Sequence, residues 1–470
     1  MARAPLSVED TIKRIKQSPS TKVKVAIVDT DGILRGKYIH RDKFLSAVDK
    51  PAGGGGGSSS VAAGFGFCNV VFGWDAADVC YDNVRYTGWH SGYPDALAQI
   101  DLATFREVPW DGGVPFFLGD FRNTEGGPLA ICPRQLLKRV VGQLTQSGFS
   151  ALASLEYEFF NFRETPQSLE DKQFRQLSTM TPGMFGYSVL RLAQNRDYIN
   201  ALFDEMAAFR VPIEGLHTET GPGVLEAAIL YADPVEAADR AVLFKSGAKE
   251  IGHRFGIVPS FMAKWNQSLP GCSGHIHQSL WDADQKRNLF FDEGRPGQLS
   301  ELFEHYLAGQ LHCLPDILAM YAPTVNSYKR LVEGAWAPTR ANWGIDNRTT
   351  ALRVIPGGPR STRIETRVTG SDGNPYLALA ASLASGLYGI RNQLPLPAAA
   401  VAGSGYADTS AARLSSTLDE AAQRFERSRL SHELFGAEFV EHFAATRRWE
   451  WQQFGKAVSD WELARYFQII

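Results

Sequence analysis

The chain has 470 residues, of which 44% are hydrophobic and 11% aromatic, and its 48 lysines and arginines nearly balance 51 aspartates and glutamates. The formal net charge of −3 lacks the basic excess typical of a protein that binds nucleic acid without sequence preference or coats an anionic membrane. We therefore expect neither nucleic acid nor a membrane as a partner, and the hydrophobic content excludes global disorder.

The five cysteines are scattered along the chain, and none forms a CxxC pair. This pattern argues against a disulfide framework or a zinc ribbon and favours a reducing cytoplasm. The first residues, MARAPLSVEDTIKRIK, contain no apolar core typical of a signal peptide, and no apolar run approaches the length of a membrane span. We therefore expect a cytoplasmic protein.

The N-terminal part begins with two predicted strands, residues 23–28 and 33–39, around an Asp-Thr-Asp-Gly turn typical of an antiparallel pair. Residues 51–60, PAGGGGGSSS, could cradle a phosphate, but they lack the Lys-Ser/Thr ending and the flanking elements of such a loop. A flexible surface insertion is the better interpretation. A domain boundary in the loop 122–128 gives a small domain, 1–127, and a large one, 128–470.

Helices dominate the predicted large domain. Residues 133–147 form an amphipathic helix with one apolar face, which consists of Leu136, Leu137, Val140, Val141 and Leu144. Further helices are predicted near 197–209, over 233–255 and, with breaks at Gly436 and Asp460, over 417–467. The second of these opens with Asp233 as its N-cap. Because short strands lie between the helices, we predict an α+β fold.

Three short predicted strands carry ionisable residues at every second position, so that these side chains share one face of each strand. The runs are LEYEFF (155–160), GHIHQS (274–279) and RIETR (363–367). One such run alone would be explained by a water-facing strand, but three, one of them built from histidines, favour a polar cavity. The residues on the shared faces are Glu156, Glu158, His275, His277, Ser279, Arg363, Glu365 and Arg367.

A fourth run, EGLHTETGPGVLE (214–226), places carboxylates on both sides of a Gly-Pro-Gly turn. The turn allows a tight reversal that brings Glu219 and Glu226 within reach of one ion, with Glu214 and His217 nearby. Together with the strand residues, the candidate ligands are five or six glutamates and one or two histidines, without a thiolate. This oxygen-rich set suits Mg²⁺ or Mn²⁺ rather than structural zinc.

An arginine-rich segment follows at 340–367, where six arginines stand against two acids. A solvated basic surface is one interpretation, and a site that grips carboxylates and phosphates is the other. Metal ions held by carboxylates beside arginines are what phosphoryl transfer from a nucleotide requires. The sequence contains no Walker loop, kinase signature or dinucleotide fingerprint, which excludes the usual nucleotide-binding folds.

The motifs LEYEF, HTETGPGVLE, SGHIHQS, NSYKRLV, NRTTALRV and RIETR, in this order, resemble those of the glutamine synthetase family over about residues 20–470. The resemblance implies an α+β protein with a small N-terminal β-grasp domain and a large catalytic domain. It also implies a homo-oligomer, commonly a dodecamer of stacked rings, with active sites between neighbouring subunits.

The resemblance further implies that ATP binds with two or three divalent ions, Mg²⁺ or Mn²⁺. The ligands of one ion would be Glu158, Glu219 and Glu226, and those of the second Glu156, His275 and Glu365. The ATP contacts would be Glu214, His277, Ser279, Arg353, Arg360 and Arg363. The glutamate contacts would be Arg330, Arg348, Arg367 and Gly271. The catalytic residues would be Arg348, Arg353 and Arg367, with Arg348 stabilising the phosphoryl group in transfer.

The implied reaction has two steps: the γ-carboxylate of glutamate attacks ATP, and an amine then displaces phosphate from the acyl phosphate. Members that use ammonium carry a Glu in the flap after NSYKRLV, where this chain has Trp336, and an Asp in an N-terminal loop whose counterpart, 65–74, contains no acid. Loss of both acidic contacts disfavours ammonium, whereas aromatic rings can pack against an organic amine or a polyamine. We therefore predict a γ-glutamyl-amine ligase with an amine pocket formed by Trp336, Phe67 and Phe72.

Other interpretations stay open at this point. Trp336 could serve only to pack the flap down. An ordinary glutamine synthetase would have to bind ammonium without either acid, and a catalytically silent relative would have no need for the complete ligand set. Val224 and Pro270 replace family residues near the expected glutamate pocket, which leaves the strictness for glutamate open.

Overall fold

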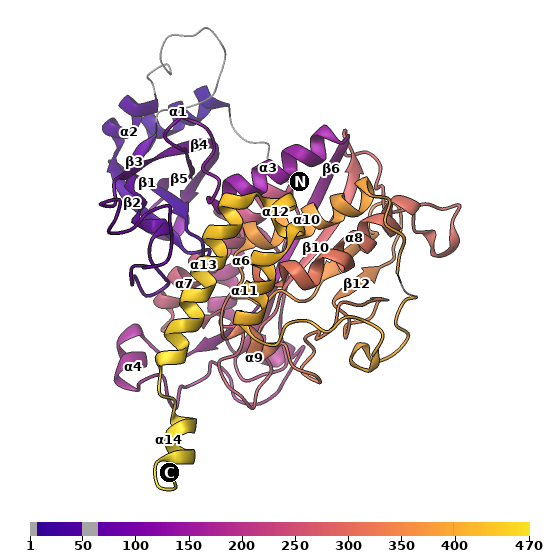
Figure 1. The fold of residues 1–470 in the computed structure, drawn as a ribbon. Helices are drawn as coiled ribbons and strands as arrows, with labels where there is room; N and C mark the ends of the chain where they lie inside the picture. The colour runs from indigo at the N-terminus through magenta and orange to yellow at the C-terminus, as the bar shows by residue number, and fades with distance from the viewer. Residues whose placement is uncertain (1–6, 49–63, 398) are drawn as a thin grey trace.

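The computed structural model describes residues 7–48, 64–397 and 399–470, so the predicted insertion at 51–60 lies outside the described residues. The chain forms a five-stranded sheet near the N-terminus and an eight-stranded sheet in the large part. Figure 1 shows the two parts side by side, with helices packed beside the larger sheet. The fold is therefore a mixed helix and strand one, as predicted. Among the described helices, none has the length and apolarity that a membrane crossing needs.

The N-terminal sheet has the strand order β2-β1-β5-β4-β3. The predicted strand pair is confirmed: β1 and β2 are antiparallel, and Gly32 in their turn adopts a φ of +79°. The Asp29 carboxylate accepts hydrogen bonds from the backbone N–H groups of Asp31 and Ile33, which fixes this turn. The elements are α1 Val8–Gln17, β1 Lys22–Val28, β2 Leu34–His40, α2 Arg41–Val48, β3 Phe65–Cys68, β4 Asp95–Val108 and β5 Val114–Phe121. That this sheet forms a β-grasp domain stays a prediction.

The eight-stranded sheet runs in the order β11-β12-β13-β10-β6-β8-β7, and β9 pairs with the end of β6. Its strands are β6 Phe149–Phe162, β7 Ile213–Thr218, β8 Val224–Ile229, β9 Val258–Ser260, β10 Gly274–Asp282, β11 Trp343–Ile345, β12 Leu352–Ile355 and β13 Arg363–Thr366. The three runs of alternating charge are thus confirmed as strands, and they are direct neighbours in the sheet. Strand β10 pairs with β6, about 120 residues before it, and with β13, about 90 residues after it.

Strand β6 shows how the sheet separates an apolar face from a charged one. Tyr157 and Phe159 are buried and contact Phe244, with ring centroids 6.3 and 5.7 Å apart. Phe244 belongs to the helix α7 Pro234–Arg254, which packs on this face of β6. Because successive side chains of a strand point to opposite faces, Glu156 and Glu158 lie on the other face of the sheet.

The predicted helices are confirmed with small shifts at their ends, and Gly436 breaks the C-terminal helices with a φ of +79°. The longer helices of the large part are α3 Pro133–Gln146, α6 Arg196–Ala208, α7 Pro234–Arg254, α8 Glu301–Ile317, α10 Pro375–Arg391, α11 Leu418–Arg427 and α13 Ala437–Lys456. The shorter ones are α4 Pro166–Asp171, α5 Val189–Ala193, α9 Ser327–Arg330, α12 Arg429–Phe435 and α14 Asp460–Tyr466.

Asp233 is the N-cap residue of α7, as predicted, but its side chain makes no capping hydrogen bond. Its carboxylate instead accepts a hydrogen bond of 2.6 Å from the Gln285 amide, which joins α7 to the turn after β10. Glu236 in the first turn of α7 binds Arg106 of the N-terminal sheet at 2.9 Å, so tertiary contacts replace the predicted local cap.

A buried charge cluster joins the N-terminal sheet to α3 and α7. Arg134 of α3 binds Asp120 of β5 at 2.7 Å and Asp239 of α7 at 2.9 Å, and Asp101 of β4 lies 3.0 Å from both Arg134 and Lys138. Ala26 and Leu118 of the N-terminal sheet also belong to the main hydrophobic core. The predicted boundary at 122–128 stays a prediction.

The cluster predicts a pH-dependent loss of stability. Burial alone would raise the pKa of Asp101, but Arg134 and Lys138 lower it to about 2. Because the pKa is lowered on folding, the ionised Asp101 stabilises the folded state at pH values above its ordinary pKa of 3.8. This stabilisation is lost as the pH falls through about 2. We expect Asp101→Asn to reduce the free energy of unfolding by about 1–2 kcal/mol at pH 7.

Urea unfolding at pH 7, 5 and 3 measures this difference, which should shrink as the pH falls. The exposed Asp204 on α6 supplies the control, and Asp204→Asn should show no such pH dependence. A difference for Asp101→Asn that stays constant across this range would contradict the assignment.

Candidate active site

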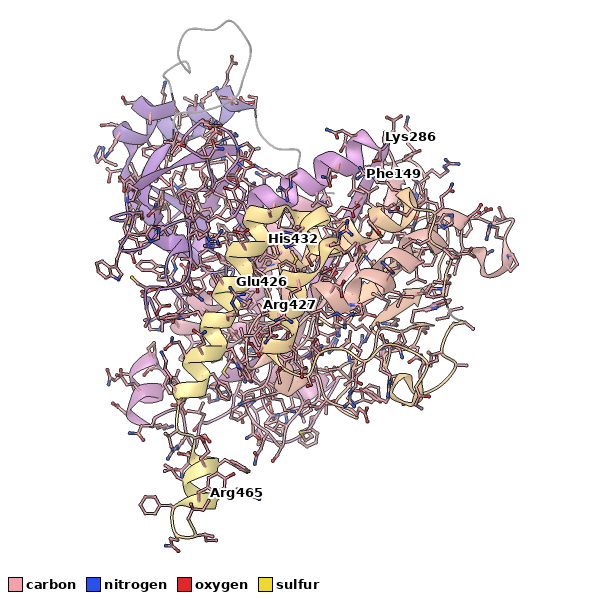
Figure 2. All side chains as sticks on the ribbon, viewed as in Figure 1. Phe149, Lys286, Glu426, Arg427, His432 and Arg465 are labelled. Carbon is pink, nitrogen blue, oxygen red and sulfur yellow. The ribbon has the colours of Figure 1, made fainter. Side chains whose placement is uncertain are left out.

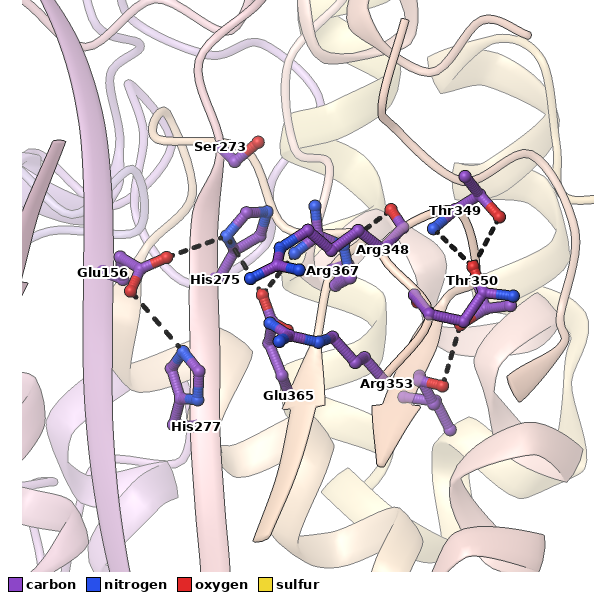
Figure 3. Close-up of polar contacts among 12 residues, drawn as sticks. Glu156, Ser273, His275, His277, Arg348, Thr349, Thr350, Arg353, Glu365 and Arg367 are labelled. Carbon is purple, nitrogen blue, oxygen red and sulfur yellow. Dashed lines mark hydrogen bonds and ion pairs between the residues drawn. The ribbon is translucent and has the colours of Figure 1, made fainter. Parts of the chain in front are cut away.

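Three neighbouring strands bring the first group of ionisable side chains together. In the sheet register, His275 of β10 lies opposite Glu156 of β6, and His277 of β10 lies opposite Glu365 of β13. The His275 Nδ1 atom is 3.3 Å from a carboxylate oxygen of Glu156 and 3.3 Å from one of Glu365 (Figure 3). The His277 Nε2 atom is 3.7 Å from the second oxygen of Glu156. These four residues form a compact pocket of carboxylate and imidazole groups.

The electrostatics of this group keep its carboxylates ionised. Burial opposes ionisation of Glu365, but His275, Arg367, His277 and Arg353 lower its pKa to about 2. Burial likewise opposes ionisation of Glu156, whose pKa is nevertheless held well below its ordinary value by hydrogen bonds from both histidines. Burial and Arg367 lower the pKa of His275, which favours the neutral ring that ligates metal ions.

A second group lies at the end of the β7–β8 hairpin. The His217 Nε2 atom is 2.9 Å from a carboxylate oxygen of Glu226, and its Nδ1 atom is 3.8 Å from Glu219. Gly223 in the turn has a φ of +74°, and a Cβ atom there would lie 2.7 Å from the Asn161 carbonyl oxygen, so only glycine fits. Burial and repulsion from Glu156 and Glu158 raise the pKa of Glu226 to about 8, although His217 opposes this.

Both groups fit divalent ions. Within Glu156, His277 and Glu365, and within His217, Glu219 and Glu226, the potential ligand atoms all lie within 4.8 Å of one another. The Nε2 atom of His275 is buried without a hydrogen-bond partner in the described part of the chain, as expected of an unused ligand. A cation near Glu226 would also remove the repulsion that raises its pKa.

The predicted ligand sets are partly brought together. Glu156, His275 and Glu365 are adjacent as expected, and His277, which was assigned to ATP, joins them. Glu219 and Glu226 share one group as expected, but their neighbour is His217. Glu158 stands opposite Glu226 in the sheet register, and one of its oxygens accepts a hydrogen bond of 2.6 Å from the Ser273 backbone N–H. The ligand assignments themselves stay predictions.

The arginines divide into those that surround Glu365 and those that do not. Arg353 donates to Glu365 at 2.8 Å, Arg367 donates to its other oxygen, and Arg363 contacts His277 at 3.2 Å. Arg367 also holds the Arg348 carbonyl oxygen at 3.0 Å, while the Arg348 side chain itself is exposed. Arg340 lies apart from this cluster, because it donates to backbone oxygens near 406 and 411.

A cavity of about 930 Å³ opens beside the first group. Five of the six predicted ATP contacts line it: Glu214, His277, Ser279, Arg360 and Arg363. Arg353, the sixth, binds Glu365 and Asp346 instead. Tyr231 and Trp281 also line the cavity and were missed by the sequence analysis. Trp281 lies two positions after Ser279 on β10. It therefore continues the pattern in which His275, His277 and Ser279 share one face of the strand, and this pattern could have indicated it. Figure 2 shows Lys286, another lining residue, near the outer end of β10.

The glutamate assignments of Arg330 and Gly271 meet a different arrangement. Arg330 is buried, and its guanidinium donates to the carbonyl oxygens of Val368 and Arg367 at 3.0 Å and to the Ser273 hydroxyl at 2.9 Å. A Cβ atom on Gly271 would lie 2.8 Å from the Arg330 side chain. In this arrangement Arg330 braces the backbone beside Glu158, and a role in binding glutamate stays a prediction.

Comparison with known proteins decides the family. Residues 130–466 match the family described as glutamine synthetase, catalytic domain. The chain belongs to the glutamine synthetase family. It is therefore an ATP-dependent ligase, and the metal- and ATP-binding chemistry inferred from its glutamates and arginines is the chemistry expected of this family.

Some relatives of this glutamine synthetase family member are named as glutamine synthetases, and others are named as ligases of organic amines. It is 49% identical to type-1 glutamine synthetase 2 of Dictyostelium discoideum, over 99% of this chain and 87% of the relative. It is 36% identical to glutamate–isopropylamine ligase of Pseudomonas sp, over 95% of both chains. It is 37% identical to gamma-glutamylethanolamide synthetase GlnA4 of Streptomyces coelicolor, over 99% of this chain and 96% of the relative.

Solved structures support the same fold. A structure titled as a complex of GmaS with ADP matches with a TM-score of 0.81 and 25% sequence identity. The match covers 99% of this chain and 100% of the GmaS chain, so it includes the N-terminal sheet as well as the large part.

The three predicted amine-pocket residues of this ligase are not equivalent. Trp336 is 63% exposed, and it has a φ of +59° in the segment after α9. Phe67 and Phe72 are buried in the N-terminal hydrophobic cluster, where both contact the Phe121 ring, at centroid distances of 6.2 and 5.1 Å. These two rings form part of the sheet's own core, and their role in an amine pocket stays a prediction.

The structure adds Tyr187 to the aromatic residues beside the site. Its ring stacks on His217 with centroids 4.3 Å apart and planes 20° apart. Burial and the carboxylates Glu219 and Glu226 raise its pKa, which reflects how close the hydroxyl lies to the second group. The sequence around Tyr187 carries no alternation or spacing that would have indicated this contact.

Tyr231 lines the same cavity as the expected ATP contacts, and we therefore predict that its ring takes part in nucleotide binding. Stacking of a base on an aromatic ring contributes about 1–3 kcal/mol. We therefore expect Tyr231→Ala to raise the KM for ATP by about tenfold or more, measured by phosphate release at saturating glutamate and amine. Tyr231→Phe, which keeps the ring, should stay within about twofold of wild type, and equal KM values for all three proteins would contradict a stacking role.

Proposed function

We propose that the enzyme joins the γ-carboxylate of glutamate to an organic amine through a γ-glutamyl phosphate intermediate. Three observations support an organic amine over ammonium. Trp336 is exposed where ammonium-using members of the family carry a glutamate, and residues 65–74 contain no acid. Relatives named for isopropylamine and ethanolamide chemistry cover nearly the whole chain at 36% and 37% identity.

The arrangement of the chain's own residues supports this chemistry. A carboxylate and an amine do not condense at neutral pH until one carboxylate oxygen becomes a good leaving group. In the first step a γ-carboxylate oxygen of glutamate attacks the γ-phosphorus of ATP, and the bond to ADP breaks. In the second step the amine nitrogen attacks the acyl carbon, phosphate leaves, and the nitrogen loses a proton. Negative charge moves between oxygens throughout, and the arginines around Glu365 are placed to hold it.

Two or three divalent ions, Mg²⁺ or Mn²⁺, are part of this proposal. The first group of carboxylate and imidazole side chains would hold one ion, and the group at the β7–β8 hairpin another. Bound ions supply positive charge that neutralises phosphate oxygens. Glu365 orients the guanidinium groups of Arg353 and Arg367, and the exposed Arg348 is free to reach the transferred group.

The alternative is an ordinary glutamine synthetase, which is favoured by the 49% identical relative with that name. Phosphate release with ATP, Mg²⁺ and glutamate, compared across ammonium, methylamine, ethanolamine, putrescine and aniline, separates the two. We expect a higher kcat/KM for an organic amine, and a preference for ammonium would overturn the proposal. No phosphate release with any acceptor would indicate a catalytically silent relative.

We also propose a homo-oligomer, with a ring-based dodecamer as the expected form. Helix α14 extends away from the body of the chain, as Arg465 shows in Figure 2. This end of the chain exposes Trp461, Leu463, Phe467, Ile469 and Ile470. Soluble monomers rarely expose such a continuous apolar surface, so a second copy is its expected cover.

Light scattering coupled to size-exclusion chromatography tests the assembly. We expect a mass near twelve times the 51.8 kDa of one chain, and a lower mass when the chain is truncated after Val458. A wild-type monomer would contradict the proposal.

The cytoplasm stays the expected compartment, in agreement with five cysteines that are all free.

A further inference from the structure

Lys245 lies on the side of the sheet that faces away from the two ionisable groups. It belongs to α7, which packs on the apolar face of β6, and its ammonium group is 5.5 Å from the centroid of the Tyr157 ring and 5.7 Å from that of Phe261. Burial lowers the pKa of Lys245 to about 8, because an ammonium group loses its water there. A lysine in such surroundings needs hydrogen-bond acceptors that compensate for the lost water.

The acceptors of Lys245 are two backbone oxygens of one loop. Its Nζ atom donates to the Ser371 carbonyl oxygen at 2.7 Å and lies 3.4 Å from the Gly373 carbonyl oxygen. The Ser371 backbone N–H donates to the Cys272 carbonyl oxygen at 3.1 Å, just before β10. Lys245 therefore ties α7 to the loop that joins β13 to α10.

The Ser371 side chain extends from this loop to Glu158. Its hydroxyl lies 2.6 Å from the Glu158 carbonyl oxygen and 2.7 Å from the Ser273 carbonyl oxygen, and it shares its one proton between them. Ser273 in turn donates its backbone N–H to the Glu158 carboxylate at 2.6 Å. Ser371 is completely buried, so bulk water does not compete for these contacts. Ser371 therefore holds both the backbone of Glu158 and the residue that binds its carboxylate.

We propose that Lys245 is a positioning residue for the metal site: through Ser371 it fixes the Glu158 carboxylate and so sets the affinity for a divalent ion. This inference rests on the proposed function and on Glu158 as a ligand of one of its ions. Replacing a residue behind a metal ligand typically weakens the binding of the ion by about 10- to 100-fold. Neither Lys245 nor Ser371 is among the expected ligands, so their effect must pass through Glu158.

Binding of Mn²⁺ to the chain, measured by calorimetry without nucleotide, tests this role. Lys245→Met keeps the length of the side chain and removes the ammonium group, and Ser371→Ala removes only the hydroxyl. We expect each substitution to raise the Kd for Mn²⁺ by about tenfold. Because both act along one path, the double variant should have a Kd within about threefold of that of the weaker-binding single variant.

Two residues supply matched controls. Lys249 lies one turn further along α7 and lines a cavity of about 1030 Å³ together with Lys245, but its ammonium group lies over the Phe261 ring, 5.9 Å from the centroid. Ser385 of α10 is also completely buried, and its hydroxyl contacts carbonyl oxygens of its own helix. Lys249→Met and Ser385→Ala should leave the Kd within about twofold of wild type. Thermal unfolding without metal ions reports the stability of each variant separately from its ion binding.

The outcomes separate this inference from the proposed function. A Kd for Lys245→Met within about twofold of wild type, whatever its melting temperature, overturns the positioning role and leaves the ligase intact. The same result for Ser371→Ala, or a double variant whose loss equals the product of the two single losses, overturns the path through Ser371. Ser371→Ala alone decides if Lys245→Met does not fold. Failure of the wild type to bind Mn²⁺ overturns the proposed metal sites themselves, and the inference with them.

Discussion

Replacing Glu365 by glutamine is expected to reduce glutamate-dependent phosphate release by about 10²- to 10³-fold. Glu365 is almost completely buried, and it accepts hydrogen bonds from Arg353 and Arg367 and lies 3.3 Å from His275. Glutamine keeps the volume but removes the charge, so two guanidinium groups are left without their carboxylate. Breaking a buried pair of this kind costs about 3–5 kcal/mol, which corresponds to the expected loss when the arrangement serves catalysis.

The control for this experiment is Glu304→Gln on α8. Glu304 also accepts a hydrogen bond from an arginine, Arg295 at 3.0 Å, but both side chains are partly exposed and lie away from the cavity. We expect a change in rate below about twofold there. Binding of Mn²⁺, measured by calorimetry without nucleotide, should weaken in Glu365→Gln and stay unchanged in Glu304→Gln. Wild-type rates in Glu365→Gln would remove Glu365 from the catalytic arrangement.

Replacing Trp336 by glutamate is expected to shift the preference toward ammonium. The indole is 63% exposed and supplies apolar surface for an organic amine, whereas a carboxylate at this position supplies a partner for a small cation. We expect the ratio of kcat/KM for ammonium to that for n-propylamine to rise by about 10- to 100-fold. The backbone φ of +59° disfavours both side chains, so the change adds no new backbone strain of its own.

Trp336→Phe separates the charge from the loss of the indole. It keeps an aromatic ring in the flap, and its ratio should remain within about threefold of wild type. Steady-state rates with both acceptors at saturating ATP and glutamate provide the measurement. If Trp336→Glu leaves the ratio unchanged, Trp336 only packs the flap, and the preference for an organic amine must originate elsewhere.

The strands that carry the site could be predicted because their signal is local. Alternation with a period of two identifies β6, β10 and β13 and states which side chains share a face, and the structure confirms these strands. The order of the strands carries no local signal, because β13, β10 and β6 are separated by long stretches of chain. Both His275 and His277 lie near Glu156 and Glu365. For His277 this follows only from the register of the strands.

Tyr187 depends on a contact that the sequence does not indicate, whereas the burial of Phe67 follows from a local pattern. Tyr187 reaches His217 because the backbone at 185–188 is bound to Thr218, about thirty residues further along the chain. Phe67 was placed in the amine pocket by resemblance, yet β3 alternates Phe65, Gly66 and Phe67, which is the pattern of a strand with one buried face. The period of the strand therefore predicts the burial of Phe67, whereas its place in the amine pocket stays a prediction.

The opposite faces of β6 impose a limit on how this protein can evolve. Glu156 and Glu158 alternate with Tyr157 and Phe159, and the strand is held on both sides by β10 and β8. One inserted or deleted residue within β6 would rotate every following side chain to the other face, so that carboxylates would enter the apolar core and aromatic rings the site. Substitutions at single positions can therefore retune this site, but the length of its central strand must be inherited unchanged.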